Sequence, residues 1–189
     1  GDVYKRQGDI VLTTPVVRCL KQQLQDVEIH YASKTSFASF IEPNPYIDKV
    51  HLLGDNEKAF ITTLQEEQFD YVIDLHHNLR TLRIKKALNA KAYSFDKLNF
   101  KKALLVYLRL NVMPEKHIVD RYMDTVSELG VKNDGLGLDY FIPEKDVVDT
   151  SVFPMLHKKG FVAFAIGGQH STKRLPAHKM VELCDKIAQ

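Results

Sequence analysis

Short apolar segments typical of strands alternate along this chain with amphipathic segments typical of helices, and this alternation restricts the possible folds more than any other feature. An alternating order with short links predicts a parallel sheet covered by helices on both faces. Functional residues are then expected in the loops that follow the strands. We expect strands at 27–32, 49–53, 71–75, 91–95 and 138–142, and helices at 9–24, 35–41, 57–67, 79–88, 100–110 and 117–129.

The composition changes after Pro143 to a polar stretch that is typical of a linker. The apolar segment 161–166 then predicts the strand of a second strand, loop and helix unit, and the sequence stops at Gln189. We therefore expect one α/β domain over 1–150. Residues 151–189 are expected to form a linker and the truncated start of a second α/β domain.

The N-terminal residues 1–7 occupy the place where an α/β domain of this kind has its first apolar strand. They are mostly polar or charged, and only Val3 and Tyr4 favour a strand. Either this strand is damaged, or the segment is a non-native junction. In the helix that follows, Pro15 fits the first turn of a helix capped by Thr14, or it kinks a helix that already begins at Asp9.

The bulk composition describes a globular protein, with 189 residues of which 44% are hydrophobic. Ten of the 26 Lys and Arg residues fall between Arg80 and Lys116 against two of the 24 acids, so this block carries +8 and the remainder −6. The block favours either an anionic partner or simply a set of solvated helix faces.

Neither Cys19 nor Cys184 has the spacing of a metal site or a redox motif, so both are expected to be buried thiols in a reducing compartment.

No apolar run has the length that a transmembrane helix needs, and the first residues do not resemble a secretory signal. The chain is therefore expected in the cytoplasm, with a membrane surface as an open alternative. The segment 100–110 is consistent either with a helix lying against lipid or with a buried core helix.

Two segments carry candidate chemistry. Asp9 follows Gly8 at the start of a helix, where a carboxylate serves either as an ordinary helix cap or as a catalytic base. The loop 167–176 departs from the P-loop pattern, because Thr172 precedes its lysine and Arg174 follows it. Its backbone N–H groups, hydroxyls and ammonium group could still stabilise a phosphate, or form an ordinary turn with a cap; the residues concerned are Gly167, Gly168, Ser171, Thr172 and Lys173.

The adjacent His76 and His77 have no third ligand at a diagnostic spacing, so a polar loop after a strand is the better interpretation and no metal site is predicted. His117 with Asp120 is interpreted as the start of a helix in preference to a catalytic pair.

Four segments appear in the order found in family 9 glycosyltransferases, the ADP-heptose:lipopolysaccharide heptosyltransferases and their relatives, and the chain resembles that family over residues 8–189. These segments are Gly8-Asp-Ile-Val-Leu-Thr-Thr-Pro-Val-Val-Arg18, Asp74-Leu-His-His-Asn-Leu-Arg80, His117-Ile-Val-Asp-Arg-Tyr122 and Lys173-Arg-Leu-Pro176. The resemblance implies a B-type glycosyltransferase fold of two Rossmann-like domains, with the acceptor on the first and the sugar nucleotide mainly on the second.

The resemblance also implies a reaction and its residues. Asp9 would be the general base of an inverting, metal-independent transfer of a heptose-like sugar from ADP-heptose to an anionic, lipid-linked lipopolysaccharide core at the inner membrane. No cofactor other than the nucleotide-sugar substrate, and no nucleic acid, is expected. The donor diphosphate would contact Ser171, Thr172 and Lys173, with the backbone of Gly167 and Gly168, and the acceptor would contact Gly8, Thr13, His76, Asn78 and Arg80.

The sequence departs from the family pattern at several places. The usual apolar first strand is replaced by residues 1–7, Leu175 stands where an aromatic residue is common, and the later donor-domain motifs are missing. We therefore expect an inactive fragment. Two alternatives stay open, a sugar-nucleotide enzyme of the same fold such as an epimerase, and a non-catalytic module that binds an anionic sugar or lipid.

Overall fold

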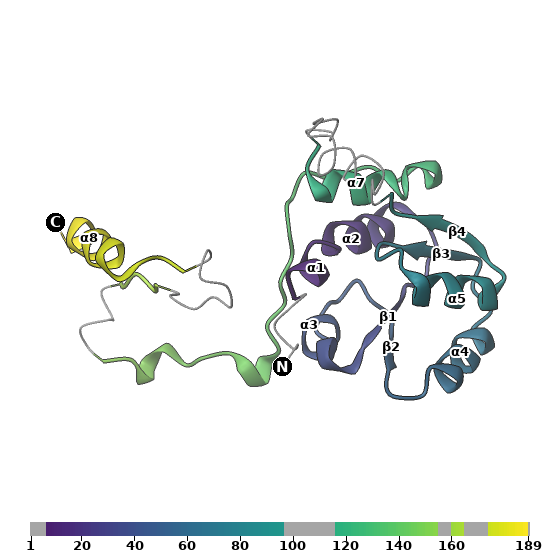
Figure 1. Ribbon diagram of the computed structural model, residues 1–189, viewed down its shortest axis with the longest axis horizontal. Coiled ribbons are helices and arrows are strands. Elements are labelled where there is room, and N and C mark those ends of the chain that lie inside the picture. The colour runs from purple at the N-terminus through teal and green to yellow at the C-terminus, as the bar shows by residue number, and fades with distance from the viewer. Residues whose placement is uncertain (1–6, 97–115, 155–159, 165–173, 189) are drawn as a thin grey trace. The chain divides into compact units, whose positions relative to one another are not determined.

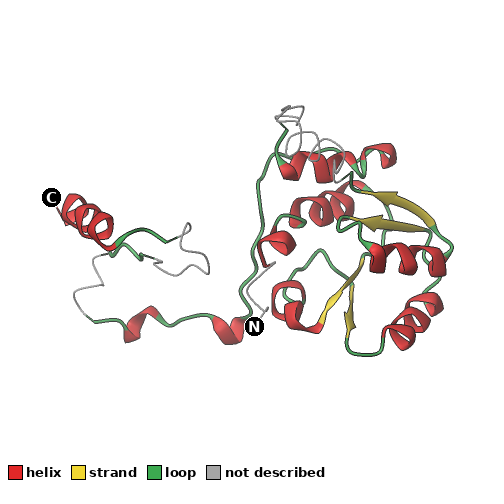
Figure 2. Cartoon of the chain, in the orientation of Figure 1, coloured by secondary structure: helices red, strands yellow, loops and turns green. Residues whose placement is uncertain are grey.

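The computed structural model describes residues 7–96, 116–154, 160–164 and 174–188 (Figures 1 and 2). The chain divides into two units, Gly1–Val147 and Val148–Gln189, and each is described by itself. Among the described residues, no helix combines the length and the hydropathy that crossing a bilayer requires.

The first unit begins with two helices, α1 (Gln7–Val11) and α2 (Thr14–Gln23). Pro15 stands in the first turn of α2, where its missing N–H removes no helix hydrogen bond, and Thr13 rather than Thr14 is the N-cap residue. Both expectations for Pro15 are therefore partly correct. A helix already exists at Asp9, as the kinked alternative predicts, but it is interrupted, and Pro15 lies in the first turn of a new helix.

Four strands form two parallel pairs instead of the expected single sheet. Strand β1 (His30–Lys34) pairs with β2 (Lys49–Leu53), and β3 (Tyr71–Asp74) pairs with β4 (Lys91–Ser94). Within the described residues, no strand joins the two pairs. Residues 1–7 occupy the place where a fold of this kind has its first strand. Of this segment only Gln7 is described, and Gln7 is helical.

Helices connect these strands as expected for an α/β fold. The 3₁₀ turn η1 (Thr35–Phe37) and α3 (Ala38–Ile41) follow β1, α4 (Glu57–Glu66) follows β2, and α5 (Leu79–Leu88) follows β3. After β4, the described part continues with α7 (Ile118–Asp124) and η2 (Ser127–Leu129), which Gly130 ends in the left-handed conformation. The helix expected at 100–110 lies outside the described residues.

The core of this unit lies where α2 packs beside α7 (Figure 1). The buried side chains of this cluster come from both helices and the loops around them, and they are Val16, Cys19, Leu20, Phe95, Tyr122, Met123, Val126 and Val131. The rings of Phe95 and Tyr122 meet edge to face with their centroids 4.7 Å apart, a favourable aromatic geometry.

The prediction of a strand at 138–142 is wrong, because side chains of α2 hold this segment and it pairs with none of the described strands. The Thr14 hydroxyl accepts a hydrogen bond from the Asp139 N–H at 2.9 Å. The buried guanidinium of Arg18 donates to both carboxylate oxygens of Asp134 at 2.7 and 2.8 Å, to the Asp139 carboxylate and to the Gly137 carbonyl. These contacts replace the ladder hydrogen bonds that a strand would need.

The second unit contains the 3₁₀ turn η4 (Thr150–Val152) and the helix α8 (Ala177–Ala188). Of the strand expected at 161–166, residues 161–164 are described and are not in a strand. Cys19 is buried as expected, but the expectation for Cys184 is wrong, because this thiol is exposed on α8.

Candidate functional site

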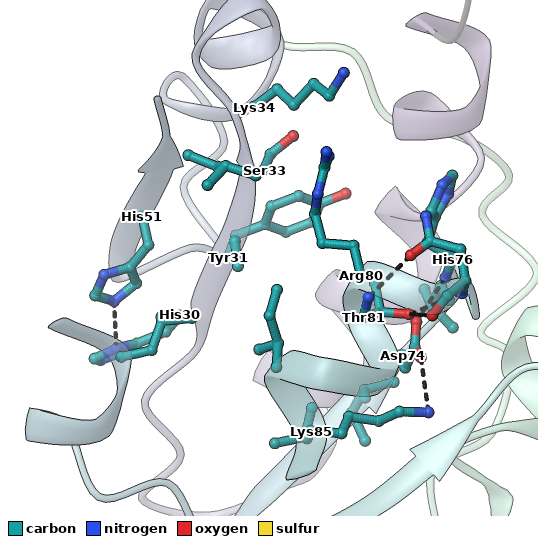
Figure 3. Close-up of a pocket in the computed structure, with 18 of the residues that line it drawn as sticks. His30, Tyr31, Ser33, Lys34, His51, Asp74, His76, Arg80, Thr81 and Lys85 are labelled. Atoms are coloured by element: carbon teal, nitrogen blue, oxygen red, sulfur yellow. Dashed lines mark hydrogen bonds and ion pairs between the residues drawn. The ribbon is translucent and has the colours of Figure 1, made fainter. Parts of the chain in front are cut away.

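A cavity of about 820 Å³ in the first unit lies between β1 and β3. Figure 3 shows Tyr31, Ser33 and Lys34 of β1 on one side of it, and Asp74, His76 and Thr81 from the end of β3 and the start of α5 on the other. Every residue of β1 and of β3 contributes to its lining. Because successive side chains of a strand point to opposite faces, such a continuous lining means that the cavity follows the edges of both strands.

At the carboxyl ends of the two strands the cavity is lined by Lys34, which ends β1, and His76, which follows β3, and this end is called the mouth below. In open α/β sheets this edge is where ligands bind. The cavity therefore lies where the alternation of strands and helices predicts function.

Asp9 borders this cavity from α1, and its side chain is exposed. Its carboxylate also acts on Tyr122: burial raises the pKa of the Tyr122 phenol, and the negative charge of Asp9 raises it further. Asp9 is thus in reach of solvent and of anything that enters the cavity, as a proton acceptor must be.

Thr13 also lines the cavity, but its hydroxyl already has two partners in the protein. It donates to the Ile10 carbonyl at 2.7 Å and lies 2.9 Å from the phenol of Tyr31. Burial raises the pKa of Tyr31, so this phenol stays protonated near neutral pH. The pair connects α1 to β1 and fixes the wall beside Asp9.

Asp74 organises the loop after β3. One of its carboxylate oxygens accepts hydrogen bonds from the N–H groups of His76 and His77 at 3.1 and 2.6 Å, and the Lys85 ammonium lies 2.8 Å from the other. Burial opposes ionisation, yet the hydrogen bonds from Lys85 and His77 outweigh it and lower the pKa of Asp74. Asp74 is therefore an ionised residue that shapes the loop.

Asn78 lines the cavity as the N-cap of α5. Its side chain accepts from the Thr81 N–H while the Thr81 hydroxyl accepts from the Asn78 N–H, both at 2.9 Å. This reciprocal capping box explains why α5 begins at Leu79. The Asn78 side chain thus already has a structural function.

The mouth of the cavity carries more cations than carboxylates. Arg80 and Arg83 share one carboxylate, Glu57, at 3.1 and 3.6 Å, and Lys34 lies on the same lining. Exposed groups of this kind attract an anion without binding it tightly by themselves.

The structure therefore brings Asp9 together with four of the five acceptor candidates, Thr13, His76, Asn78 and Arg80, and leaves Gly8 off the lining. The donor candidates Gly167, Gly168, Ser171, Thr172 and Lys173 all lie outside the described residues. Their role, and the cleft that they were expected to form with Asp9, stay predictions.

Tyr31 and Lys34 are cavity residues that the sequence analysis missed. The available signal was the position of Lys34 at the carboxyl end of a strand, where functional residues of an α/β fold are expected. The signal was lost because the strand was expected at 27–32, whereas β1 runs from His30 to Lys34.

Comparisons with known proteins agree with this architecture, although no family model matches the chain. The chain is 23% identical to lipopolysaccharide heptosyltransferase 1 of Campylobacter coli, over 95% of the chain and 57% of that protein. Its structure resembles the crystal structure of the glycosyl transferase family 9 protein from Veillonella parvula DSM 2008 with a TM-score of 0.65, at 22% identity over 96% of this chain and 57% of that one.

The chain thus spans just over half the length of the two relatives that it matches. The structural likeness confirms the expected fold class, an α/β fold with parallel strand pairs of the glycosyltransferase B type. Taken together, the heptosyltransferase match in sequence and the family 9 match in structure confirm the resemblance of this chain to family 9 glycosyltransferases.

Proposed function

We propose that this chain forms the acceptor-binding part of a family 9 glycosyltransferase that transfers a heptose-like sugar from ADP-heptose to an anionic lipopolysaccharide core at the inner membrane. The observation that carries the proposal is the common cavity, whose lining includes Asp9 and the cationic Arg80 and Lys34. The similarity to a lipopolysaccharide heptosyltransferase supports the choice of donor and acceptor.

The proposed chemistry is a single displacement with inversion. The Asp9 carboxylate removes the proton of an acceptor hydroxyl, the oxygen attacks the anomeric carbon, and the nucleoside diphosphate leaves with the bonding electrons. Lys173, with Ser171, Thr172 and the N–H groups of Gly167 and Gly168, would stabilise the charge on the leaving diphosphate. The nucleotide sugar is a substrate, and the reaction needs no further cofactor or metal.

In this proposal the residues of the cavity have different functions. His76 and Arg80 contact the anionic acceptor from the loop after β3. Thr13 and Asn78 hold α1 and α5 in place through the hydrogen bonds described above, so their contribution to acceptor binding is mainly indirect.

The test is an assay of the whole protein with ADP-heptose, with and without a lipid-linked anionic core acceptor. The proposal predicts release of ADP and labelling of the lipid only when the acceptor is present. An epimerase would instead convert the donor without acceptor, and a binding module would leave it unchanged; either result would refute the proposal.

Arg80→Ala makes the assay specific for the cavity. Loss of one cation that contacts an anionic acceptor should raise the acceptor KM by about tenfold, the change expected for roughly 1.4 kcal/mol, with little change in the KM for the donor. Lys58→Ala, on the exposed part of α4 and outside the cavity lining, is the matched control.

A further inference from the structure

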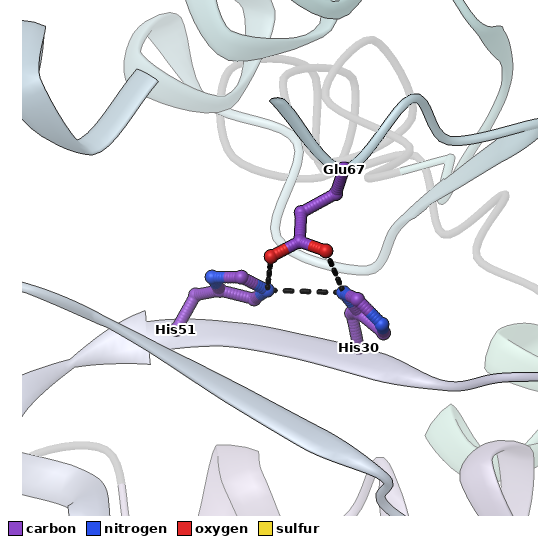
Figure 4. Close-up of side chains that lie close together, drawn as sticks. All are labelled: His30, His51 and Glu67. Atoms are coloured by element: carbon purple, nitrogen blue, oxygen red, sulfur yellow. Dashed lines mark hydrogen bonds and ion pairs between the residues drawn. The ribbon is translucent and has the colours of Figure 1, made fainter. Parts of the chain in front are cut away.

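A group of two histidines and one glutamate lies at the opposite end of β1 from the mouth of the cavity. His30 is the first residue of β1, His51 is in the middle of β2, and Glu67 directly follows α4 (Figure 4). No function proposed above uses these residues.

The register of the two strands brings the imidazoles together. His30 lies opposite Lys49 and His51 lies opposite Ala32, so the two histidines are diagonal neighbours on one face of the pair. Nδ1 of His30 and Nε2 of His51 share a hydrogen bond of 3.0 Å, whose proton a metal would displace, and the ring centroids are 5.1 Å apart. Two ring nitrogens therefore point at the same small volume.

Glu67 closes this volume from the third side, as Figure 4 shows. One of its carboxylate oxygens is 3.9 Å from His30 Nδ1 and the other is 3.8 Å from His51 Nε2. A metal with bonds of about 2.0–2.1 Å places tetrahedral ligand atoms roughly 3.4 Å apart. Because the 3.8 and 3.9 Å distances end on different oxygens, the measure that applies is that one ligand atom from each residue lies within 4.8 Å of the other two. A rotation of the Glu67 side chain that brings one oxygen nearer to both rings would complete the coordination triangle.

The surroundings also favour coordination through His30 Nδ1. The other nitrogen of that ring, Nε2, is 2.8 Å from the Glu28 carboxylate, an arrangement that directs the Nδ1 lone pair inward. The ring of Phe69 packs edge-on against His30 and His51, with centroid distances of 5.1 and 6.3 Å. The two histidine side chains are only 9% and 5% exposed, and both also line the cavity, from which a water molecule can reach them.

We propose that His30, His51 and Glu67 bind a divalent transition metal, with Zn²⁺ as the best match, and that a water molecule supplies the fourth ligand. Two imidazoles and a carboxylate suit zinc better than they suit magnesium or calcium, which prefer all-oxygen ligands. The metal would link the end of α4 to the first residue of β1 and the middle of β2, and His30 and His51 also belong to the lining of the cavity that Asp9 borders. The metal would have no part in the proposed transfer reaction.

Lys49 competes with the metal, because its ammonium forms an ion pair with Glu67. The Lys49 side chain is 52% exposed and can move into solvent when a metal arrives. This competition gives a specific prediction: Lys49→Met should bind the metal several-fold more tightly than the unchanged chain. Equal or weaker binding would mean that Glu67 is not a ligand.

The direct test is calorimetric titration of the metal-free 189-residue chain with Zn²⁺ alone, with native mass spectrometry to count the ions. We expect one ion per chain with a Kd of about 1 µM or below, and a rise in the thermal unfolding midpoint with added Zn²⁺. No binding up to about a hundredfold higher concentration would overturn the proposal.

Variants assign the bound ion to the cluster. His51→Gln should abolish the 1:1 binding, whereas His178→Gln on the exposed face of α8 should not change it. Glu28→Gln alters an exposed side chain and should leave the fold intact, yet weaken binding by about 10–100-fold, as expected for a residue that orients a metal-bound histidine. Unchanged binding in both His51→Gln and Glu28→Gln would place the ion elsewhere and refute the proposal.

Discussion

Arg18 shows how one buried charge can define the path of a distant segment. Its side chain is only 2% exposed, and it donates hydrogen bonds to Asp134, Asp139 and the Gly137 carbonyl. These bonds hold the segment after Gly130 against α2. A buried arginine is tolerated because its planar donors are satisfied by several acceptors at once.

Arg18→Met should therefore lower the free energy of unfolding by about 3 kcal/mol, the lower end of the range for losing one partner of a buried ion pair, because both aspartates are partly exposed and water can hydrate them. Urea unfolding followed by circular dichroism measures this change. The matched control is Lys21→Met, which removes a partly exposed pair with Asp48 from the same helix and should cost less than about 1 kcal/mol. Equal losses in the two variants would contradict this account of Arg18.

The contact of Arg18 with Asp134 also predicts how the free energy of unfolding depends on pH. The hydrogen bonds from Arg18 hold the pKa of Asp134 far below its ordinary value. In the unfolded chain Asp134 has the ordinary aspartate pKa of about 3.9. As the pH falls, its carboxylate therefore takes up a proton in the unfolded chain before it does so in the folded chain. The stabilisation of the folded chain by the ion pair of Arg18 with Asp134 is complete above about pH 3.9 and is lost as the pH falls below that value. Between pH 6 and pH 3, Asp134→Asn should show a shallower loss of unfolding free energy than the unchanged chain, and parallel curves would exclude Asp134 as the cause.

At the scale of single residues, the resemblance implied that Asp9, His76 and Arg80 belong to one acceptor site, and all three line the same cavity. It did not reveal the pairing of Arg18 with Asp134 and Asp139, since those residues are more than 100 positions apart and no local pattern connects them. The histidine cluster was missed for the same reason. The spacing of His30, His51 and Glu67 matches no metal motif, and only the strand register brings them together.

At the scale of elements, the best predicted boundaries are those fixed by local chemistry. Helix α5 begins and ends where expected, at Leu79 and Leu88, because Asn78 caps its start and Asn89 adopts the left-handed conformation at its end. Strand β2 also agrees over Lys49–Leu53. The strand expected at 138–142 failed because its apolar residues say nothing about a partner, and Thr14 and Arg18 of α2 hold Asp139 instead.

The two strand pairs predict what the N-terminal segment should do. Within the described residues, β1 pairs only with β2 and β3 only with β4, and the facing edges of β1 and β3 border the cavity. Replacing residues 1–6 by a hexapeptide rich in valine and isoleucine should add a parallel strand along these edges and raise the thermal unfolding midpoint by several degrees, because it supplies main-chain hydrogen bonds and buries apolar surface.

A glycine- and serine-rich hexapeptide of the same length is the control and should leave the midpoint unchanged. Calorimetry of the two variants separates strand pairing from the mere replacement of the native segment. Equal midpoints would show that the edges of β1 and β3 do not accept a strand. Such a strand would fill the part of the cavity between the edges of β1 and β3, whereas His76 and Arg80, which follow β3, would still border the part beyond the carboxyl ends of the strands.

At the scale of the whole molecule, the expected fold class is confirmed, while the expected pairing of the two halves stays a prediction. The fold follows from the alternation of strands and helices, which the local periodicity of hydrophobic residues in the sequence predicts well. The arrangement of the donor residues around Lys173 relative to Asp9 depends on how two units are placed, and periodicity carries no information about that. The relatives share the fold over 57% of their own length, which is why substrate identity is part of the proposal.

The central claim is that Asp9 removes the acceptor proton, and Asp9→Asn in the whole protein tests it most directly. The amide keeps the size and hydrogen-bonding capacity of the side chain but is not a base at neutral pH. Turnover should fall by roughly two to four orders of magnitude, the usual effect of losing a general base, while acceptor binding measured by calorimetry stays within about twofold. Unchanged turnover, or a loss of acceptor binding that accounts for the whole decrease, would contradict the claim.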